Sequence, residues 1–243
     1  MSDVLPRHPV AGYVLAGGLS TRMGTEKALL PLAGKPLIEH AVTKLRRLCT
    51  EVFILSSNPA LAAFAPLVPD LHPRCGPLGG IEAALAHSPH DWVFTLPVDL
   101  PFLPTGFLDD WVRQITNPHS RRNFRVAMFR VFGRPQPTLL LIHRDAAPMI
   151  AGAVARGEFK LLPALEHAAA QLAPPGAPAY DRLPYTLPVD EHLRWTGSAE
   201  PHPGPQWRAP TPAQLAAQSL WFANLNTPED LALAQTHLSA LDT

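Results

Sequence analysis

The sequence predicts an α/β fold in which a mostly parallel, twisted sheet carries helices on both faces. Short apolar runs that fit buried strands alternate with longer segments whose apolar residues recur every three or four positions. The order strand, helix, strand, helix, strand over residues 10–96 is typical of βαβ units, which pack parallel strands under covering helices. A glycine-rich loop follows the first of these runs, at the edge where open parallel sheets bind ligands.

The first half of the chain supplies the clearest elements. The apolar run Val10–Ala16, bounded by proline and glycine, is expected to be the first strand. Leu37–Leu48 predicts an amphipathic helix, with Lys44, Arg46 and Arg47 near the end at which a helix dipole favours cations. The other elements predicted here are a strand at Glu51–Ser57, a helix at Gly79–His87 and a strand at Trp92–Leu96.

The second half is less regular. It predicts a helix at Phe107–Ile115, strands at Arg125–Val131 and Thr138–Ile142 that pair across Gly133–Pro137, and helices at Asp145–Ala155 and Lys160–Leu172. Residues 174–212 hold ten prolines in 39 positions, so we expect a surface excursion that takes no part in the sheet. Order resumes at Phe222–Asn226, and a closing helix begins at Pro228. The expected organisation is a single domain over residues 1–243.

Composition excludes several classes of protein. The 20 basic and 20 acidic side chains give a net charge of +0, so no long-range field attracts nucleic acid. Two cysteines, Cys49 and Cys75, are too few for a disulfide framework, and the expected compartment is the reducing cytoplasm. No apolar stretch reaches the roughly 18 residues of a membrane span. The histidines show no zinc-binding spacing.

The loop Leu15–Lys27 (LAGGLSTRMGTEK) is the first candidate site. Its glycines and hydroxyl side chains, together with Arg22 and Lys27, are of the kind that cradle phosphate groups through backbone N–H groups and positive charge. It is not a Walker A loop, because Gly24 is followed by Thr25 and not by lysine. The alternative is a tight turn with charged surface residues.

Polar residues also follow the other predicted strands. Asp99 comes just after Trp92–Leu96, between two prolines, where a carboxylate suits Mg²⁺ or, alternatively, stabilises a turn. Asn58 and Asp70 follow the second strand, and each taken alone is more often a turn residue. The glycine-rich turn in Cys75–Leu85 would let its backbone approach a flat ligand closely. The sequence thus gathers candidate ligand groups at one sheet edge.

Four motifs occur in order along the chain: LAGGLSTRMGTEKALLPLAGKPLIEH, CGPLGGI, PVDLPFLP and FANLNTPEDL. Together they resemble the molybdenum cofactor guanylyltransferase family, within the broader group of nucleotidyltransferases with a Rossmann-like parallel sheet. The resemblance covers most of residues 10–165 and again 222–235, and it implies a Rossmann-like nucleotidyltransferase fold. The chain departs from the usual pattern at Glu26, where the family commonly has aspartate, and at Gln136, where relatives often have histidine.

Carried over position by position, the resemblance implies a role for each matching residue. Arg22, Lys27 and Asp99 would carry catalysis, with Arg22 facing the triphosphate. The implied GTP contacts are the backbone of Leu15, Ala16 and Gly17, the phosphate contact Lys27, the nucleoside contacts Asn58 and Asp70, and Asp99, which also holds Mg²⁺; the implied pterin contacts are Asn224 and Asn226.

The activity implied by the resemblance is transfer of GMP from GTP to the phosphate of molybdenum-molybdopterin, with Mg²⁺ as cofactor. The product is the molybdopterin guanine dinucleotide cofactor, and molybdoenzymes or other cofactor-biosynthesis proteins are candidate partners. Two alternatives stay open: a related transferase that uses CTP or a sugar phosphate, and a non-catalytic nucleotide-binding or cofactor-carrier protein. Retention of Lys27 and Asp99 argues against the second. The first, and nearer, alternative is distinguished by turnover with GTP, CTP and UTP.

Overall fold

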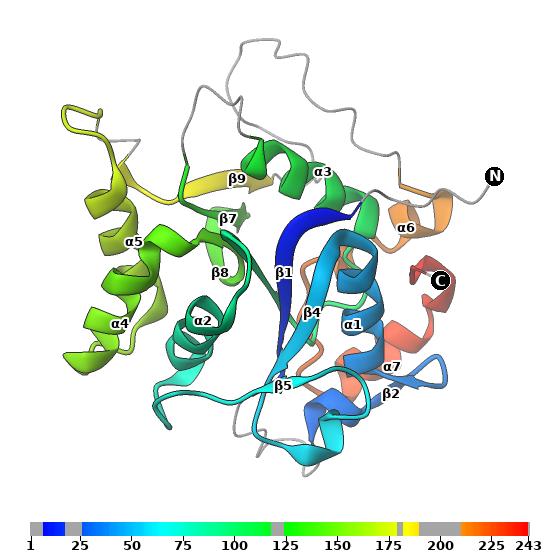
Figure 1. The fold of residues 1–243 in the computed structure, drawn as a ribbon. Helices are drawn as coiled ribbons and strands as arrows, with labels where there is room; N and C mark the ends of the chain where they lie inside the picture. The colour runs from blue at the N-terminus through cyan, green and yellow to red at the C-terminus, as the bar shows by residue number, and fades with distance from the viewer. Residues whose placement is uncertain (1–6, 18–25, 118–123, 179–181, 190–209, 243) are drawn as a thin grey trace.

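The computed structural model describes residues 7–17, 26–117, 124–178, 182–189 and 210–242 (Figure 1). Seven strands form its central sheet: β1 (His8–Leu15), β4 (Cys49–Leu55), β5 (Leu67–Val68), β6 (Trp92–Pro97), β7 (Val126–Val131), β8 (Arg134–His143) and β9 (Tyr185–Val189). Their order across the sheet is β5-β4-β1-β6-β8-β7-β9. A separate two-stranded hairpin is made by β2 (Pro31–Leu32) and β3 (Lys35–Pro36).

Most strands of the sheet run in one direction. β1 is parallel to both β4 and β6, and β4 is parallel to β5. β8 is antiparallel to its neighbours β6 and β7, whereas β9 is parallel to β7. Among the described strands of this sheet, β8 is therefore the one that opposes the other six, and the predicted α/β class with a mostly parallel sheet is confirmed.

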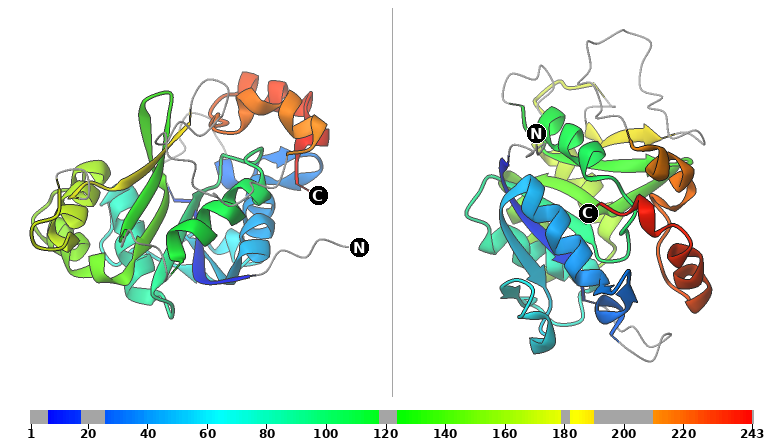
Figure 2. Two further views of the ribbon diagram at one scale, coloured as in Figure 1. Left: turned by 90° about the horizontal axis from the view of Figure 1, so that it is seen from above. Right: turned by 90° about the vertical axis from the view of Figure 1, so that its right-hand side faces the viewer.

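Helices cover both faces of the sheet (Figure 2). On β1, Val10 and Val14 face one core, shared with helices α1 and α3, while Ala11 and Tyr13 face the other, shared with α2, α4 and α5. This alternation is the period of two that a strand buried on both faces requires. The α-helices are α1 (Leu37–Leu48), α2 (Gly76–His87), α3 (Thr105–Thr116), α4 (Ala147–Ala155), α5 (Leu161–Leu172), α6 (Pro212–Ala216) and α7 (Pro228–Gln235).

Several predicted boundaries agree closely with the structure. The helix predicted at Leu37–Leu48 has those bounds, and its apolar stripe is buried against β1 and β4. The α2 helix begins at Gly76, three residues before the predicted start. Gly76 has φ +60°, which ends the preceding loop, and Pro77 suits the first turn because that turn needs no backbone donor there. The described residues contain no helix that is long and apolar enough to cross a bilayer.

The hairpin between β7 and β8 is tighter than predicted. Gly133–Pro137 was expected to be the connection, but β8 already begins at Arg134. Phe132 and Gly133 alone make the turn, with φ values of +48° and +76°. Two successive residues with positive φ are typical of the short turn whose twist matches that of paired strands. Arg134–Pro137 therefore belongs to the sheet.

The proline-rich segment was also predicted wrongly in one respect. Residues 174–212 were expected to stay out of the sheet, yet β9 lies within them and pairs with β7 from Ala127↔Tyr185 to Val131↔Val189. Because β9 is the edge strand, only one of its sides needs ladder hydrogen bonds, and an edge tolerates proline. The ring of Tyr185 also stacks on Phe124, with centroids 4.1 Å apart. The single-domain organisation stays a prediction.

Candidate active site

The carboxyl ends of four strands meet at one edge of the sheet, the lower edge in Figure 1. In the ladder, Leu15 at the end of β1 is opposite Leu55 of β4 and Pro97 of β6, and Leu55 is opposite Val68 of β5. The segments after these strands therefore leave the sheet side by side. They carry the candidate residues Ala16, Gly17, Asn58, Asp70 and Asp99, as predicted from the sequence.

Three predicted site residues contact one another at this edge. The Lys27 ammonium lies 2.6 Å from Asp99 Oδ2 and 2.5 Å from Asn226 Oδ1. The side chains of Lys27 and Asp99 are 17% and 15% exposed, so the ion pair is largely shielded from water and yet open on one side. The Lys27 ammonium already donates to a carboxylate and to an amide oxygen. It can donate a further hydrogen bond to a phosphate oxygen bound at this edge.

Asn226 reaches this position through the loop before α7. The backbone N–H of buried Leu225 donates to the Asp99 carbonyl at 3.2 Å, which fastens the loop to the end of β6. Asp230 Oδ2 accepts the backbone N–H groups of Asn226 and Thr227, each at 2.9 Å. These hydrogen bonds hold the pKa of Asp230 below its usual value, and the one from Asn226 has the largest effect. Asn224, the other predicted pterin contact, is exposed one residue before Leu225.

Asn58 has the structural role that was one of its two alternatives, and it also contacts Glu26. Its Oδ1 accepts the backbone N–H of Ala60 at 3.0 Å and so caps the 3-10 turn η2 (Pro59–Leu61), a structural role. Its Nδ2 donates to Glu26 Oε2 at 3.0 Å. Glu26 immediately precedes Lys27, at the start of η1 (Lys27–Leu29), so Asn58 also fixes the chain that carries the lysine.

Asp70 and Leu15 lie against the first turns of α2. A Cβ added at Gly80 would be 3.4 Å from Leu15 Cδ2 and 3.7 Å from Asp70 Oδ1, and one at Gly79 would be 3.0 Å from Cys75 Cβ. These glycines therefore allow the close approach between α2 and the strand ends. Burial, and then the neighbouring carboxylate of Glu82, raise the pKa of Asp70. Asp70 is thus held at this edge but does not contact the Lys27 pair through any hydrogen bond seen in the described residues.

Asp99 has a free coordination position. Its Oδ2 accepts from Lys27, whereas its Oδ1 is buried and has no hydrogen-bond partner among the described residues. An unsatisfied carboxylate oxygen fits a hard cation. In the described parts of the chain no three His, Cys, Asp or Glu side chains gather as a metal cluster. Asp99 therefore suits a cation that brings most of its ligands with it, such as Mg²⁺ on a polyphosphate.

Among the predicted site residues, Arg22 lies outside the described residues. Lys27 and Asn226 were predicted to contact different ligands, and their direct contact was not predicted. They are 199 residues apart, and no periodicity or local spacing signals a contact over that separation.

The chain is similar in sequence to known proteins. The MobA-like NTP transferase domain matches residues 12–171. A molybdenum cofactor guanylyltransferase of Serratia proteamaculans is 36% identical over 169 residues, which is 67% of this chain and 82% of that protein. The protein of the same name from Vibrio cholerae is 34% identical over 157 residues, 61% of this chain and 73% of that protein.

Solved structures share the fold at lower sequence identity. Molybdopterin-guanine dinucleotide biosynthesis protein A from Archaeoglobus fulgidus matches with a TM-score of 0.65 and 24% identity, over 95% of this chain and all of that one. A 2-C-methyl-D-erythritol 4-phosphate cytidylyltransferase from Thermus thermophilus matches with a TM-score of 0.53 and 17% identity, over 96% and 100% of the two chains. The predicted Rossmann-like nucleotidyltransferase fold is therefore confirmed.

Proposed function

The chain belongs to the MobA-like NTP transferase family, and on that premise we propose that it transfers GMP from GTP to the phosphate of molybdenum-molybdopterin. The products are the molybdopterin guanine dinucleotide cofactor and pyrophosphate. The observation that carries the proposal is the Lys27–Asp99 pair, 2.6 Å apart at the carboxyl edge of the parallel sheet. The guanylyltransferase names of the relatives support GTP over CTP and over a sugar phosphate acceptor.

The proposed roles follow the positions of the residues at the edge. The ends of β1, β4 and β5 form the nucleotide side, and the loop before α7 forms the acceptor side. The proposed GTP contacts are Leu15, Ala16, Gly17, Lys27, Asn58, Asp70 and Asp99, and the proposed pterin contacts are Asn224 and Asn226. Arg22, outside the described residues, keeps the catalytic role implied by the resemblance. The Lys27–Asn226 contact at 2.5 Å then joins the two sides of the site.

The reaction needs no protein nucleophile. A phosphate oxygen of molybdopterin attacks the α-phosphorus of GTP in line with the leaving group, a new P–O bond forms, and the bond to the β-phosphate breaks to release pyrophosphate. The acceptor is a phosphate monoester that is already anionic at pH 7, so no strong general base is required. Lys27 is placed to stabilise the negative charge that builds on the departing pyrophosphate.

Asp99 has a second task in this proposal. Its unpartnered Oδ1 would hold Mg²⁺, which supplies charge neutralisation at the phosphates when bound. The other oxygen keeps Lys27 oriented, and Glu26, held by Asn58, fixes the backbone at the base of the lysine. The chain therefore contributes orientation and fixed charge, which are the main requirements of phosphoryl and nucleotidyl transfer.

The test is turnover by the purified chain with Mg²⁺, molybdopterin and GTP, followed as pyrophosphate release. We expect release with GTP and little with CTP or UTP in parallel reactions. Molybdopterin and GTP are each omitted as controls. Equal turnover with CTP would reject the guanine assignment, and GTP binding without any pyrophosphate release would indicate a non-catalytic binding protein.

A further inference from the structure

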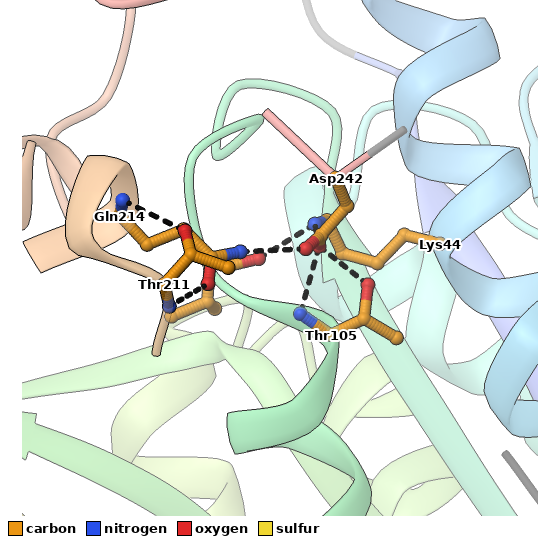
Figure 3. Close-up of polar contacts among 6 residues, drawn as sticks. Lys44, Thr105, Thr211, Gln214 and Asp242 are labelled. Atoms are coloured by element: carbon orange, nitrogen blue, oxygen red, sulfur yellow. Dashed lines mark hydrogen bonds and ion pairs between the residues drawn. The ribbon is translucent and has the colours of Figure 1, made fainter. Parts of the chain in front are cut away.

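A buried polar cluster contains none of the residues proposed to contact GTP or the pterin (Figure 3). It consists of Lys44 in α1, Thr105 at the start of α3, Gln214 in α6, and Asp242, and we call it the Asp242 cluster. The Lys44 side chain is 3% exposed and that of Asp242 is 15% exposed. Lysine at a buried position of a helix requires an explanation, because ammonium groups are buried only when they are paired.

Both oxygens of the Asp242 carboxylate are occupied (Figure 3). Oδ2 accepts from Lys44 Nζ at 2.5 Å and from the backbone N–H and hydroxyl of Thr105 at 2.8 and 2.5 Å. Oδ1 accepts from Gln214 Nε2 at 2.8 Å. Although burial raises the pKa of this carboxyl, Lys44 and the hydrogen bonds more than offset that effect and hold the pKa below its usual value. The carboxylate is thus ionised and fixed at neutral pH.

The cluster holds one end of the loop that carries Asp99. This loop connects β6 to α3, and its last residue, Pro104, gives α3 no side-chain cap. Asp242 supplies the missing acceptor at Thr105, where the helix dipole favours an anion. Lys44 also donates to the carbonyl of Leu103 at 2.6 Å. Lys44 therefore contacts the loop between Asp99 and α3, and Asp242 contacts the first residue of α3, where this loop ends.

The same C-terminal segment also holds the other end of the loop. As described above, the N–H of Leu225 donates to the Asp99 carbonyl. Between the two anchor points, residues 211–242 pack as a unit: Trp221 Nε1 donates to the carbonyl of Gln214 at 3.0 Å, and the Trp221 ring lies 5.9 Å from that of Phe107 in α3. A shift of this segment at Asp242 would therefore also displace Asn226 from Lys27.

We propose that Lys44 and Asp242 are positioning residues for the transfer reaction, which fasten residues 211–242 over the Asp99 loop and so keep Lys27 between Asp99 and Asn226. The inference rests on the proposed function, because it gives these three residues a part in the reaction. A buried ion pair contributes little net stability, since desolvation offsets most of the attraction, and apolar replacements are often as stable. The pair is better explained by the fixed relative position that it gives to the Asp99 loop and residues 211–242.

The experiment compares Asp242→Asn, the double variant Lys44→Met/Asp242→Asn and the control Glu158→Gln. The double variant leaves no buried charge without its partner, so it guards against simple unfolding of the single variant. Glu158 is in the exposed ion pair with Arg156 at 2.8 Å, in the connection between α4 and α5, which pack on the other face of the sheet from α1 and α3. Each protein is measured for kcat, for GTP affinity without molybdopterin, and for hydrogen exchange at the Leu225 amide.

For both Asp242 variants we expect kcat to fall about 10- to 100-fold, the scale of a displacement of about 1 Å at a reacting centre. GTP affinity should stay within about twofold of the native value, and exchange at Leu225 should be at least about tenfold faster. Glu158→Gln should change none of the three. Native kcat, or equal losses of kcat and GTP affinity, would overturn the proposal, as would failure of both variants to fold. The exchange result does not depend on turnover, so it tests the fastening even if the proposed reaction is wrong.

Discussion

On one side of β6 the sheet continues through β1, β4 and β5, all parallel to it; on the other side it continues through the antiparallel β8 to β7 and β9. The parallel side has its strand ends together, and all described site residues from Leu15 to Asp99 follow those strands. On the other side, β8 ends at His143 opposite Trp92, the first residue of β6. Because β8 is reversed, the loop that follows it lies at the opposite edge, whereas β7 and β9 run parallel to β6. The described residues proposed for the site come from the parallel side and from the loop before α7.

The largest effect is expected for Asp99→Asn. This change removes the charge that orients Lys27 and the oxygen proposed for Mg²⁺, so we expect transfer to fall below detection while the thermal unfolding transition persists. Asp145→Asn is the matched control, because Asp145 pairs with Arg125 at 3.1 Å on the side of β8. Near-native turnover of Asp99→Asn at ordinary Mg²⁺ concentrations would refute the metal assignment, and loss of the unfolding transition would favour a structural role.

Lys27→Ala should have the next largest effect. Removing one preorganised charge from the transition state costs about 10²-fold or more in kcat. Lys27→Arg should restore only part of the activity, because the planar guanidinium group does not replace a compact ammonium held between Asp99 and Asn226. Arg130→Ala, at the exposed position of β7, is the control. A loss smaller than threefold for Lys27→Ala would show that this lysine does not act on the phosphates.

Replacing residues 174–212 with a Gly/Ser linker tests the other side of the sheet. The linker removes β9 and the Tyr185–Phe124 stack, so we expect the melting temperature to fall by about 5 °C or more. GTP affinity should be unchanged, because the proposed GTP contacts all lie on the parallel side. Calorimetry and equilibrium GTP binding check the two expectations separately. Weakened GTP binding would mean that the two sides are not independent.

Two glycine substitutions compare the sides at the level of packing. Gly12→Ala places a Cβ 2.9 Å from Cys49 Sγ in the middle of the parallel side, and we expect about 1–3 kcal/mol of destabilisation. Gly133→Ala meets no atom within 4 Å, and only its φ of +76° is unfavourable, so about 1 kcal/mol is expected. Urea titration of both variants measures the difference. A greater loss of unfolding free energy for Gly133→Ala than for Gly12→Ala would contradict the close packing inferred at Gly12.

The smallest expected effect concerns pH. The folded-state pKa of Asp242 is lowered, so its contribution to stability is complete above the unfolded value near 4 and is lost as the pH falls through the lower, folded value. The melting temperatures of the native chain and Asp242→Asn should therefore differ by a constant amount from pH 7 to 5. Below about pH 4 the two values should converge. A difference that grows on acidification would have the wrong sign for this assignment.

The two sides of the sheet also differ in how much of their structure could be predicted from the sequence. The parallel side was predictable because each strand and helix of a βαβ unit shows its own periodicity, as Leu37–Leu48 does, and because the motif residues Lys27 and Asp99 stand next to strand ends. β9 was missed because its pairing with β7 is set by the edge position, and not by its own proline-containing sequence. The Lys27–Asn226 and Lys44–Asp242 contacts were missed for a related reason, since they depend on tertiary packing alone.

The sequence separations of those two contacts, 199 and 198 residues, also set an order of events during synthesis. The strands β1, β4, β5 and β6 are complete once the ribosome has passed residue 97, whereas Lys27 meets its second partner only after residue 226 has emerged. At about 5–20 residues per second, the interval between these two points is about 6–26 s. During that interval Lys27 has no Asn226 partner, and the acceptor side of the proposed site has not yet been synthesised.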